Sequence, residues 1–262
     1  MFNKGQIMGI VNVTPDSFSD GGDFSQTDRA VNHALTLIEE GADIIDLGGQ
    51  STRPGYTEIS AEEELSRVLP VVKALRKVSQ IPISVDTYFP SVAEAVIQAG
   101  ASIINDIKGF DTPGMGEVIA HYQTPIILMH SRQRRSDVDV ITDLQEFYQE
   151  KVQLCQSLGV PSELICFDPG IGFHKTLEEN QVILANPKLC RFEEYPLLYG
   201  VSRKRTIAHI IDESRPKERD YGSVTASLYA MSQGVDIVRV HQVKGMRDAL
   251  TTWSRLTQEL VE

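Results

Sequence analysis

Short apolar segments alternate with longer amphipathic segments from one end of this 262-residue chain to the other. The apolar segments are rich in Ile, Val and Leu and do not alternate strictly with polar residues. This composition is typical of strands that are buried on both faces of a parallel sheet. The predicted strands are Gln6–Val11, Asp43–Leu47, Ile81–Val85, Ser102–Ile104, Pro125–Met129, Leu164–Phe167, Leu197–Tyr199 and Asp236–Val240. The sequence therefore predicts an α/β fold.

The amphipathic segments predict helices between these strands. They include Arg29–Glu40, Glu62–Lys77, Asp143–Ser157, Lys204–Asp212, Val224–Gln233 and Val243–Leu260. Eight strand–helix units without a break in composition predict a single (β/α)8 TIM barrel, one domain over residues 1–262, because such barrels fill ~250 residues. A doubly wound open sheet is the alternative. That fold usually has fewer strands and a GxGxxG motif after the first, which Gly21-Gly22 and Gly48-Gly49 do not match.

Charge and cysteine content limit the classes of binding partner and the cellular compartment that we expect for this chain. Lys and Arg number 25 against 36 Asp and Glu, and the net charge of −11 argues against nucleic acid or an anionic membrane as the main partner. The early apolar run Ile7–Val11 ends at Asn12, so this run is too short for a signal or membrane segment. The three cysteines, Cys155, Cys166 and Cys190, form no CxxC pair. We therefore expect no disulfide framework or zinc site, and a reducing cytoplasm as the location.

Polar residues stand at the carboxyl ends of the predicted strands, where TIM barrels carry their chemistry. These residues are Asn12, Asp46, Asp86, Asn105, His130, Asp168, Ser202 and His241. Any single one could simply cap the helix that follows it. Eight polar groups at one face of a barrel are harder to explain as caps, so the sequence predicts a site there.

Acidic and amide groups form one part of the predicted site. Ionised Asp86 and Asp168 accept hydrogen bonds, and with Asn105 they suit a flat heterocycle that carries several N–H groups. The same residues could instead bind a magnesium ion or act as a general acid–base pair. Their spacing does not separate these alternatives.

Basic residues form the other part of the predicted site. Arg203, Lys204 and Arg205 follow the seventh strand, and Arg239 and His241 end the eighth. TIM barrels commonly place a phosphate site after these two strands, where a helix N-terminus adds its dipole. In a chain of net charge −11, this local concentration of cations indicates an anionic ligand.

Two loops are rich in small polar residues. The first covers residues 12–22 and ends in Gly-Gly, and the second covers residues 48–55 and contains Ser, Thr and Arg. Such loops can close over a ligand and exclude water. Taken alone, either could equally be an ordinary surface turn.

Together these motifs resemble those of the dihydropteroate synthase family, in family order and along nearly the whole chain. The segments that carry the resemblance are GIVNVTPDSFSDGG at 9–22, DLGGQSTRPG at 46–55, SVDT at 84–87, IND at 104–106, LMH at 128–130, DPGIGF at 168–173, SRK at 202–204 and RVH at 239–241. The resemblance implies a transferase of folate biosynthesis, a sulfonamide target. It joins 6-hydroxymethyl-7,8-dihydropterin diphosphate to 4-aminobenzoate and releases diphosphate and 7,8-dihydropteroate.

The resemblance also implies roles for individual residues. Those that would hold the pterin ring are Asp86, Asn105, Asp168 and Lys204, with walls formed by Met129, Phe173 and Gly200. Those that would bind the diphosphate are Arg53, Arg239 and His241, with Thr52 and Val240 also contacting the substrate. Those of the aminobenzoate pocket would be Phe18, Pro54, Phe173, Ser202, Lys204 and Arg205. Asn12 is the implied Mg2+ ligand, and Mg2+ the implied cofactor. The implied catalytic set is Asp20, Asp86, Asp168 and Lys204.

A dissociative, SN1-like substitution follows from this chemistry. Once diphosphate leaves, an electron-rich dihydropterin can carry positive charge on its exocyclic methylene, so no protein nucleophile is required. Asp20 would stabilise this cation or the metal. The resemblance further implies a homodimer formed through the outer helices of the barrel.

Four residues depart from the family pattern. Arg205 stands where Ser is usual, Gln50 where Glu is common, His174 where Gly is common, and Gln242 where Asp is common. These departures leave open a non-catalytic pterin-binding paralogue. A pterin-binding methyltransferase domain that works with a corrinoid protein is a further alternative, but it is not expected to keep the Ser-Thr-Arg-Pro-Gly and Ser-Arg-Lys segments.

Overall fold

Eight parallel strands form one sheet in the computed structural model, which describes residues 1–14, 23–50 and 58–257. The strands are β1 (Gln6–Asn12), β2 (Ile44–Gly48), β3 (Ile83–Asp86), β4 (Ile103–Asp106), β5 (Ile126–Met129), β6 (Ile165–Asp168), β7 (Leu198–Tyr199) and β8 (Ile237–Val240). Their order in the sheet is β6-β5-β4-β3-β2-β1-β8-β7. A parallel bridge between Phe167 and Leu197 joins the two outer strands, β6 and β7. The sheet is therefore a nearly closed barrel, and the predicted TIM barrel is confirmed over the open-sheet alternative.

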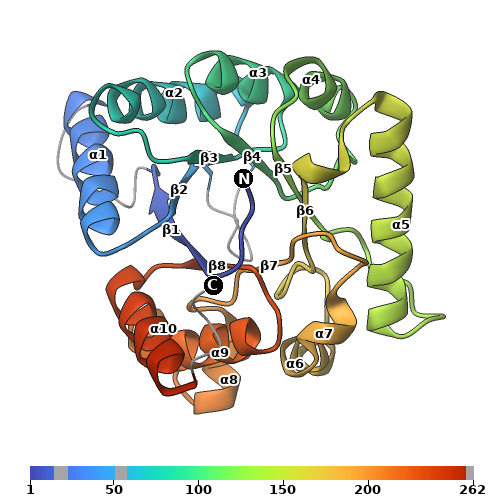
Figure 1. Cartoon of the computed structure of the whole chain (residues 1–262). Coiled ribbons are helices and arrows are strands. Elements are labelled where there is room, and N and C mark those ends of the chain that lie inside the picture. Colours follow the sequence, from blue (N-terminus) through green and yellow to red (C-terminus); the bar gives the residue numbers. More distant parts are fainter. Residues whose placement is uncertain (15–22, 51–57, 258–262) are drawn as a thin grey trace.

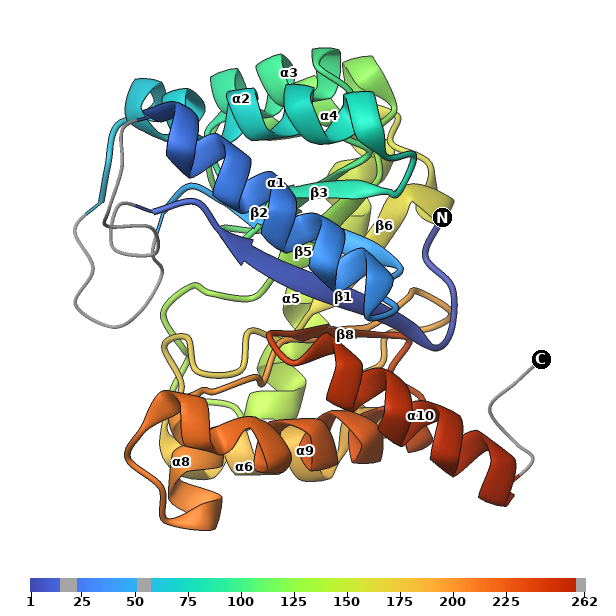
Figure 2. The ribbon, with the colours of Figure 1, turned by 90° about the vertical axis from the view of Figure 1, so that its left-hand side faces the viewer.

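Helices surround the sheet on its outer side (Figure 1). They are α1 (Asp23–Glu39), α2 (Ala61–Val78), α3 (Pro90–Gln98), α4 (Met115–Tyr122), α5 (Val140–Leu158), α6 (Leu177–Ala185), α7 (Pro187–Cys190), α8 (Arg205–Ile211), α9 (Asp220–Ser232) and α10 (Val243–Thr257), with short 3-10 turns at Ser162–Leu164 and Pro216–Arg219. Figure 2 shows α2, α3 and α4 on one side of the strands and α6, α8, α9 and α10 on the opposite side. The strands are thus buried on both faces, which explains why they contain so few exposed positions.

The inside of the barrel is filled by an apolar layer that we call the floor. Seven of the eight strands contribute one side chain each, and the N-terminal segment adds another. The floor residues are Phe2, Met8, Ile44, Ile103, Ile127, Cys166, Leu198 and Ile237. A second, larger core lies between the sheet and the helices.

Side chains along a strand alternate between the two faces, so the residue two positions after a floor residue also points inward. For β2, β4, β5, β6, β7 and β8 these positions are Asp46, Asn105, Met129, Asp168, Gly200 and Arg239. On β3, Ser84 and Asp86 occupy the same two levels. The polar residues of the site therefore stand directly above the floor.

No helix in residues 1–14, 23–50 and 58–257 is both long and apolar enough to cross a membrane. Cys155, Cys166 and Cys190 are all buried, and none forms a disulfide.

Candidate active site at the carboxyl end of the barrel

Arg239 of β8 connects two carboxylates across the mouth of the barrel. Its Nε donates to Asp46 Oδ2 at 2.6 Å, and its Nη2 donates to Asp86 Oδ2 at 3.2 Å. Asp46 is fully buried and also accepts a hydrogen bond from Ser84 Oγ at 2.6 Å, so it holds the guanidinium in place. Burial raises the pKa of Asp86 to about 8, and the neighbouring Arg239 opposes that rise.

Asn105 adds an acceptor that is not used by the described residues. Its Nδ2 donates to Asp46 Oδ2 at 3.5 Å, while its buried Oδ1 has no hydrogen-bond partner in the described part of the chain. Leaving a buried acceptor unpaired costs about 1–3 kcal/mol. Asn105 Oδ1 and the Asp86 carboxylate together are therefore suited to a ligand that brings several N–H donors.

Asp168 and Lys204 lie on the opposite side of the mouth, around Gly200. A Cβ on Gly200 would lie 3.8 Å from Lys204 Nζ, 3.9 Å from Asp168 Oδ2 and 3.9 Å from the Cβ of Arg239. Burial lowers the pKa of Lys204 to about 8, although Asp168 opposes this. The same burial raises the pKa of Asp168. Glycine at position 200 thus brings the backbone close to all three of these side chains.

Apolar side chains form a wall beside these polar groups. Met129 packs with Tyr88 and Ile107, and Phe173 packs against that cluster. The Lys204 ammonium lies 4.7 Å from the centre of the Phe173 ring, within the range of a cation–π interaction. A flat aromatic ligand could thus be enclosed by apolar faces and bound at its edges by hydrogen bonds.

Ser202 and His241 form a second polar pair near the end of β8. Ser202 Oγ lies 3.0 Å from His241 Nδ1 and accepts a hydrogen bond from the His241 backbone N–H at 3.2 Å. This pair joins the loop after β7 to the loop after β8. It brings two of the residues implied to bind substrate into contact.

Three residues expected at this face point elsewhere. Val240 is buried in the core between the sheet and the helices, as the alternation after Arg239 requires. His130 is fully buried against Phe147 of α5, with ring centres 5.0 Å apart. Arg203 donates to both carboxylate oxygens of Asp220 on α9, at 2.7 and 2.8 Å. The expectation that all the basic residues after β7 face the ligand is therefore wrong for Arg203.

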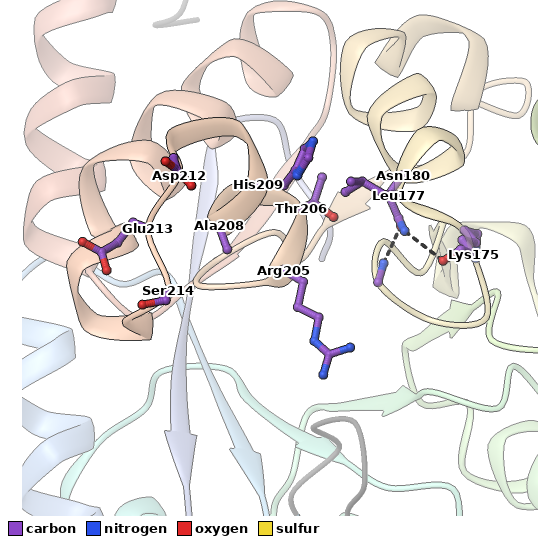
Figure 3. Close-up of a pocket in the computed structure, with 11 residues that line it drawn as sticks. Lys175, Leu177, Asn180, Arg205, Thr206, Ala208, His209, Asp212, Glu213 and Ser214 are labelled. Atoms are coloured by element: carbon purple, nitrogen blue, oxygen red, sulfur yellow. Dashed lines mark hydrogen bonds between the residues drawn. The ribbon is translucent and has the colours of Figure 1, made fainter.

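Arg205 is exposed at the first position of α8, next to a cavity of about 540 Å3 between α6 and α8. Figure 3 shows its side chain extending away from the helix. The other residues that line the cavity are Gly172, Lys175, Leu177, Asn180, Thr206, Ala208, His209, Asp212, Glu213 and Ser214. Gly172 lines this cavity, and a Cβ on Gly172 would lie 3.3 Å from Lys204 Cδ, so the cavity borders the site.

Five predicted site residues, Phe18, Asp20, Thr52, Arg53 and Pro54, lie outside the described residues. Among the residues that are described, no group of three or more His, Cys, Asp or Glu side chains could hold a metal ion. Asn12 ends β1 beside Gly48, and a Cβ on Gly48 would lie 3.8 Å from Asn12 Oδ1. Glycine at position 48 thus leaves room beside the Asn12 carboxamide.

The structure also shows the local environment of three of the departures. Gln50 uses both ends of its amide, since Nε2 donates to Tyr88 Oη at 3.1 Å and Oε1 accepts from the Ile59 N–H at 2.9 Å. His174 has a positive φ of 45°, a conformation that favours glycine. Gln242 accepts a hydrogen bond from the Gly245 N–H at 3.3 Å in the first turn of α10.

Sequence reasoning missed the partners that fix the site residues. Ser84 holds Asp46, and Lys175 binds the loop after β6. The signal for Ser84 was present, because it is the one polar residue at floor level among the inward positions of the strands. Nothing in the local sequence around Lys175 marks it as different from a surface lysine.

Replacing Gly170 with alanine is expected to lower the free energy of unfolding by more than about 2 kcal/mol and to reduce activity. Its φ is 67°, and an added Cβ would lie 2.0 Å from the His130 carbonyl oxygen, so the loop after β6 must move. Gly159→Ala is the matched control, because Gly159 has a φ of 76° but nothing within 4 Å of an added Cβ. Denaturant unfolding of both variants measures the difference. Equal losses would show that the close approach at Gly170 is unimportant.

Comparison with known proteins identifies the class that this barrel and its site define. The sequence matches the family described as pterin binding enzyme over residues 8–241. It is 46% identical to the dihydropteroate synthase of Bacillus subtilis over 92% of this chain and 85% of that protein. It is also 46% identical to the dihydropteroate synthase of a Synechocystis strain, over 92% of this chain and 86% of that protein.

Solved structures agree with the sequence relatives. The dihydropteroate synthase of Xanthomonas albilineans with 4-aminobenzoic acid has a TM-score of 0.93 and 41% identity, covering 100% of this chain and 96% of that one. The same enzyme with 7,8-dihydropteroate has a TM-score of 0.90 and 39% identity at the same coverage. A Yersinia pestis dihydropteroate synthase in a sulfonamide drug complex has a TM-score of 0.89 and 40% identity, covering 97% and 95%.

The protein is therefore a pterin binding enzyme built on a TIM barrel. Within that class, the chain belongs to the dihydropteroate synthase family of transferases, so the resemblance seen in the motifs is confirmed.

Proposed function

We propose that this chain condenses 6-hydroxymethyl-7,8-dihydropterin diphosphate with 4-aminobenzoate to give 7,8-dihydropteroate and diphosphate. The observation that carries the proposal is the set of buried acceptors at the barrel mouth, close to the cationic Arg239. Foremost among them is Asn105 Oδ1, which has no hydrogen-bond partner among the described residues. Asp86, Asn105 and Asp168 bind the N–H groups of the pterin, and Lys204 binds its acceptor atoms. Met129, Phe173 and Gly200 enclose the ring.

The reaction breaks the bond between the pterin methylene carbon and the diphosphate oxygen, and the electron pair leaves with diphosphate. Arg239 and His241 stabilise the charge that develops on the leaving group. The aniline nitrogen of 4-aminobenzoate then attacks the methylene carbon and releases a proton. Much of the rate comes from alignment of the two substrates and from exclusion of water.

The second substrate is proposed to lie between Phe173, Ser202 and Lys204. Its carboxylate points outward, toward Arg205 at the start of α8, where the cavity opens. An arginine can bind a carboxylate through two parallel hydrogen bonds, so Arg205 replaces the usual serine with a stronger anion contact.

The proposed cofactor is Mg2+, which neutralises diphosphate charge when bound. Mg2+ takes oxygen ligands and commonly binds through one or two protein groups, substrate phosphates and water. Asn12 provides one such oxygen beside Gly48, and this donor set fits a metal that arrives with the diphosphate.

Asn12→Ala is expected to raise the Mg2+ concentration needed for half-maximal activity about tenfold, because one metal ligand is lost. The kinetic parameters at saturating Mg2+ should recover in part. Asn32→Ala, on the outer helix α1, serves as the control. An unchanged metal requirement in the Asn12 variant would argue against this role.

A homodimer through the outer helices is also proposed. An apolar groove of about 730 Å3 runs over α6, α8 and α9, and several of its large side chains are exposed, including Tyr221 at 91%. Exposed apolar patches of this kind mark interaction sites.

The odd number of buried, free cysteines supports a reducing cytoplasm as the proposed compartment. The motifs along the chain support a single domain over residues 1–262.

Ile210→Glu is expected to convert the dimer to a monomer, because Ile210 is 53% exposed and borders this groove. A buried unpaired carboxylate at the interface would oppose association. Val78→Glu, at an exposed apolar residue at the end of α2, is the matched control and should leave the mass unchanged. Sedimentation velocity distinguishes the two. A monomeric wild type would refute the proposal directly.

The experiment that tests the function is diphosphate release from the dihydropterin diphosphate in the presence of Mg2+. We expect release to depend on 4-aminobenzoate and to yield dihydropteroate in equal amount. Binding of the pterin diphosphate without release would instead support the non-catalytic paralogue, and Arg205→Ser would then be the first reversion to make.

A further inference from the structure

The ammonium group of Lys175, a residue that also lines the cavity between α6 and α8, contacts three backbone carbonyls. Its Nζ donates to the carbonyl oxygens of His130 at 3.0 Å, Gly170 at 3.2 Å and Phe173 at 3.2 Å. His130 Nδ1 lies 2.9 Å away. One side chain thus binds the end of β5 and two points of the loop between β6 and α6, which we call the β6–α6 loop (residues 169–176).

The β6–α6 loop packs closely against the end of β5. An added Cβ at Gly170 would lie 2.0 Å from the same His130 carbonyl oxygen that Lys175 binds. The loop then ends in a capping box, in which Thr176 and Glu179 exchange hydrogen bonds at the start of α6. Between the close approach and the cap, the Lys175 ammonium satisfies carbonyls that no helix or strand pairs.

The other face of the loop carries the pterin end of the site. The Gly170 N–H donates to Asp168 Oδ1 at 2.7 Å, which orients that carboxylate. The Ile171 carbonyl accepts a hydrogen bond from Lys204 Nζ at 2.6 Å. The Phe173 ring lies under the same ammonium. Three groups of the proposed pterin site are therefore positioned by backbone that Lys175 holds.

A chain of polar contacts fixes Lys175 from behind. Burial lowers the pKa of His130 to about 3, so its imidazole is neutral and Nδ1 is a fourth acceptor that shares the three ammonium protons with the carbonyls. His130 Nε2 faces Asp143 Oδ2 at 3.2 Å, and Arg134 Nη1 lies 3.2 Å from the same oxygen. Arg134 in turn pairs with Glu179 of α6 at 2.8 Å. The contacts link β5, α5 and α6 around one lysine.

We propose that Lys175 is a positioning residue for pterin binding, which acts by holding the β6–α6 loop so that Asp168, Lys204 and Phe173 face the ring. The inference rests on the proposed function, since it concerns the same substrate. It assigns to Lys175 no contact with substrate. Replacing Lys175 should therefore weaken pterin binding and leave diphosphate binding, at Arg239 and His241, nearly unchanged.

The test compares Lys175→Met with the wild-type enzyme at pH 6, because burial lowers the pKa of Lys175 to about 7 and the amine is protonated there. Calorimetry measures the Kd for 6-hydroxymethylpterin, and inhibition measures that for inorganic diphosphate. We expect the pterin Kd to rise at least tenfold and the diphosphate constant to change less than threefold. Hydrogen exchange of residues 168–175 should be faster in the variant.

Lys151→Met is the matched control. Lys151 is a buried lysine on the neighbouring helix α5, but its ammonium binds the Asp111 carboxylate at 2.6 Å and not the β6–α6 loop. It should lose stability while its pterin Kd and the exchange of residues 168–175 stay within twofold of wild type. If Lys175→Met does not fold, Lys175→Arg makes the same comparison. It keeps the charge, but its planar guanidinium does not match three converging carbonyls.

Two results would overturn the inference. One is a pterin Kd within twofold of wild type in the Lys175 variants, and the other is a parallel loss of pterin and diphosphate binding, as for a residue that serves stability alone. Failure of the wild-type enzyme to bind 6-hydroxymethylpterin would instead overturn the proposed function, and the inference with it.

Discussion

Asp86→Asn is expected to lower kcat/KM for the pterin diphosphate by roughly 10²–10⁴-fold. Asp86 is buried, and its carboxylate is proposed to accept N–H groups of the ring. A hydrogen bond to a charged group contributes about 1.5–3 kcal/mol. Asparagine at this position cannot replace the two bonds that the carboxylate accepts, because its NH2 group is a donor and would face the N–H donors of the ring. Steady-state kinetics and calorimetry with 6-hydroxymethylpterin measure the loss.

Asp106→Asn is the matched control for this change. Asp106 is equally buried at the end of β4, but its carboxylate accepts the backbone N–H groups of Lys108 and Phe110. It should therefore cost stability and leave the pterin Kd within about threefold of wild type. Near-normal pterin affinity in the Asp86 variant would refute the assignment.

The raised pKa of Asp86 adds a pH dependence to the same experiment. Because its pKa is about 8, the Asp86 carboxyl becomes increasingly protonated as pH falls below 8. The protonated form accepts fewer hydrogen bonds than the carboxylate. Pterin affinity of the wild type should decrease from pH 8 to pH 6, by at most about tenfold per pH unit. The Asp86→Asn variant should lack this component.

Arg239→Met is expected to lower the free energy of unfolding by about 3–5 kcal/mol and to abolish measurable diphosphate binding. The change leaves Asp46 and Asp86 buried without their shared cation, and removing one partner from a buried ion pair has a cost of this size. Without Arg239, which opposes the rise, the folded-state pKa of Asp86 lies further above its unfolded value. The variant should therefore lose stability as pH rises from about 4 toward 8.

Urea unfolding at pH 5 and pH 8 measures this effect. Arg247→Met is the control, because Arg247 binds Asp43 and the Gly41 carbonyl at a half-exposed position on the barrel exterior. Its loss should cost about 1 kcal/mol with little dependence on pH. If the Arg239 variant is as stable as this control, the buried cluster does not need its cation.

The barrel could be predicted from sequence because its strands are short apolar runs separated by amphipathic helices. The grouping of the polar residues at the strand ends into one site could also be predicted, because the carboxyl ends of all strands in a barrel lie on the same face. Which way each side chain points was harder to read. A shift of one residue reverses the face of a side chain in a strand, and His130 and Val240 stand one residue away from inward positions.

The pairing of site residues could not be predicted, because it depends on contacts between distant parts of the chain. Asp46 and Arg239 are separated by 193 residues, yet Arg239 Nε lies 2.6 Å from Asp46 Oδ2. Arg203 stands beside Lys204 in the sequence, but a positive φ of 61° turns it toward Asp220. Local patterns carry no information on either outcome.

The separation of the apolar floor from the polar layer above it has a consequence for how such a barrel can diversify. Seven of the eight strands place one inward residue in the floor, and most of them place a polar residue at the mouth two positions later. A substitution at the upper level changes what the mouth recognises and leaves the apolar floor in place, although the residues of the Arg239 ion-pair cluster also contribute to stability. Ligand preference can therefore change by single substitutions at upper positions outside that cluster, while the floor keeps the strands packed.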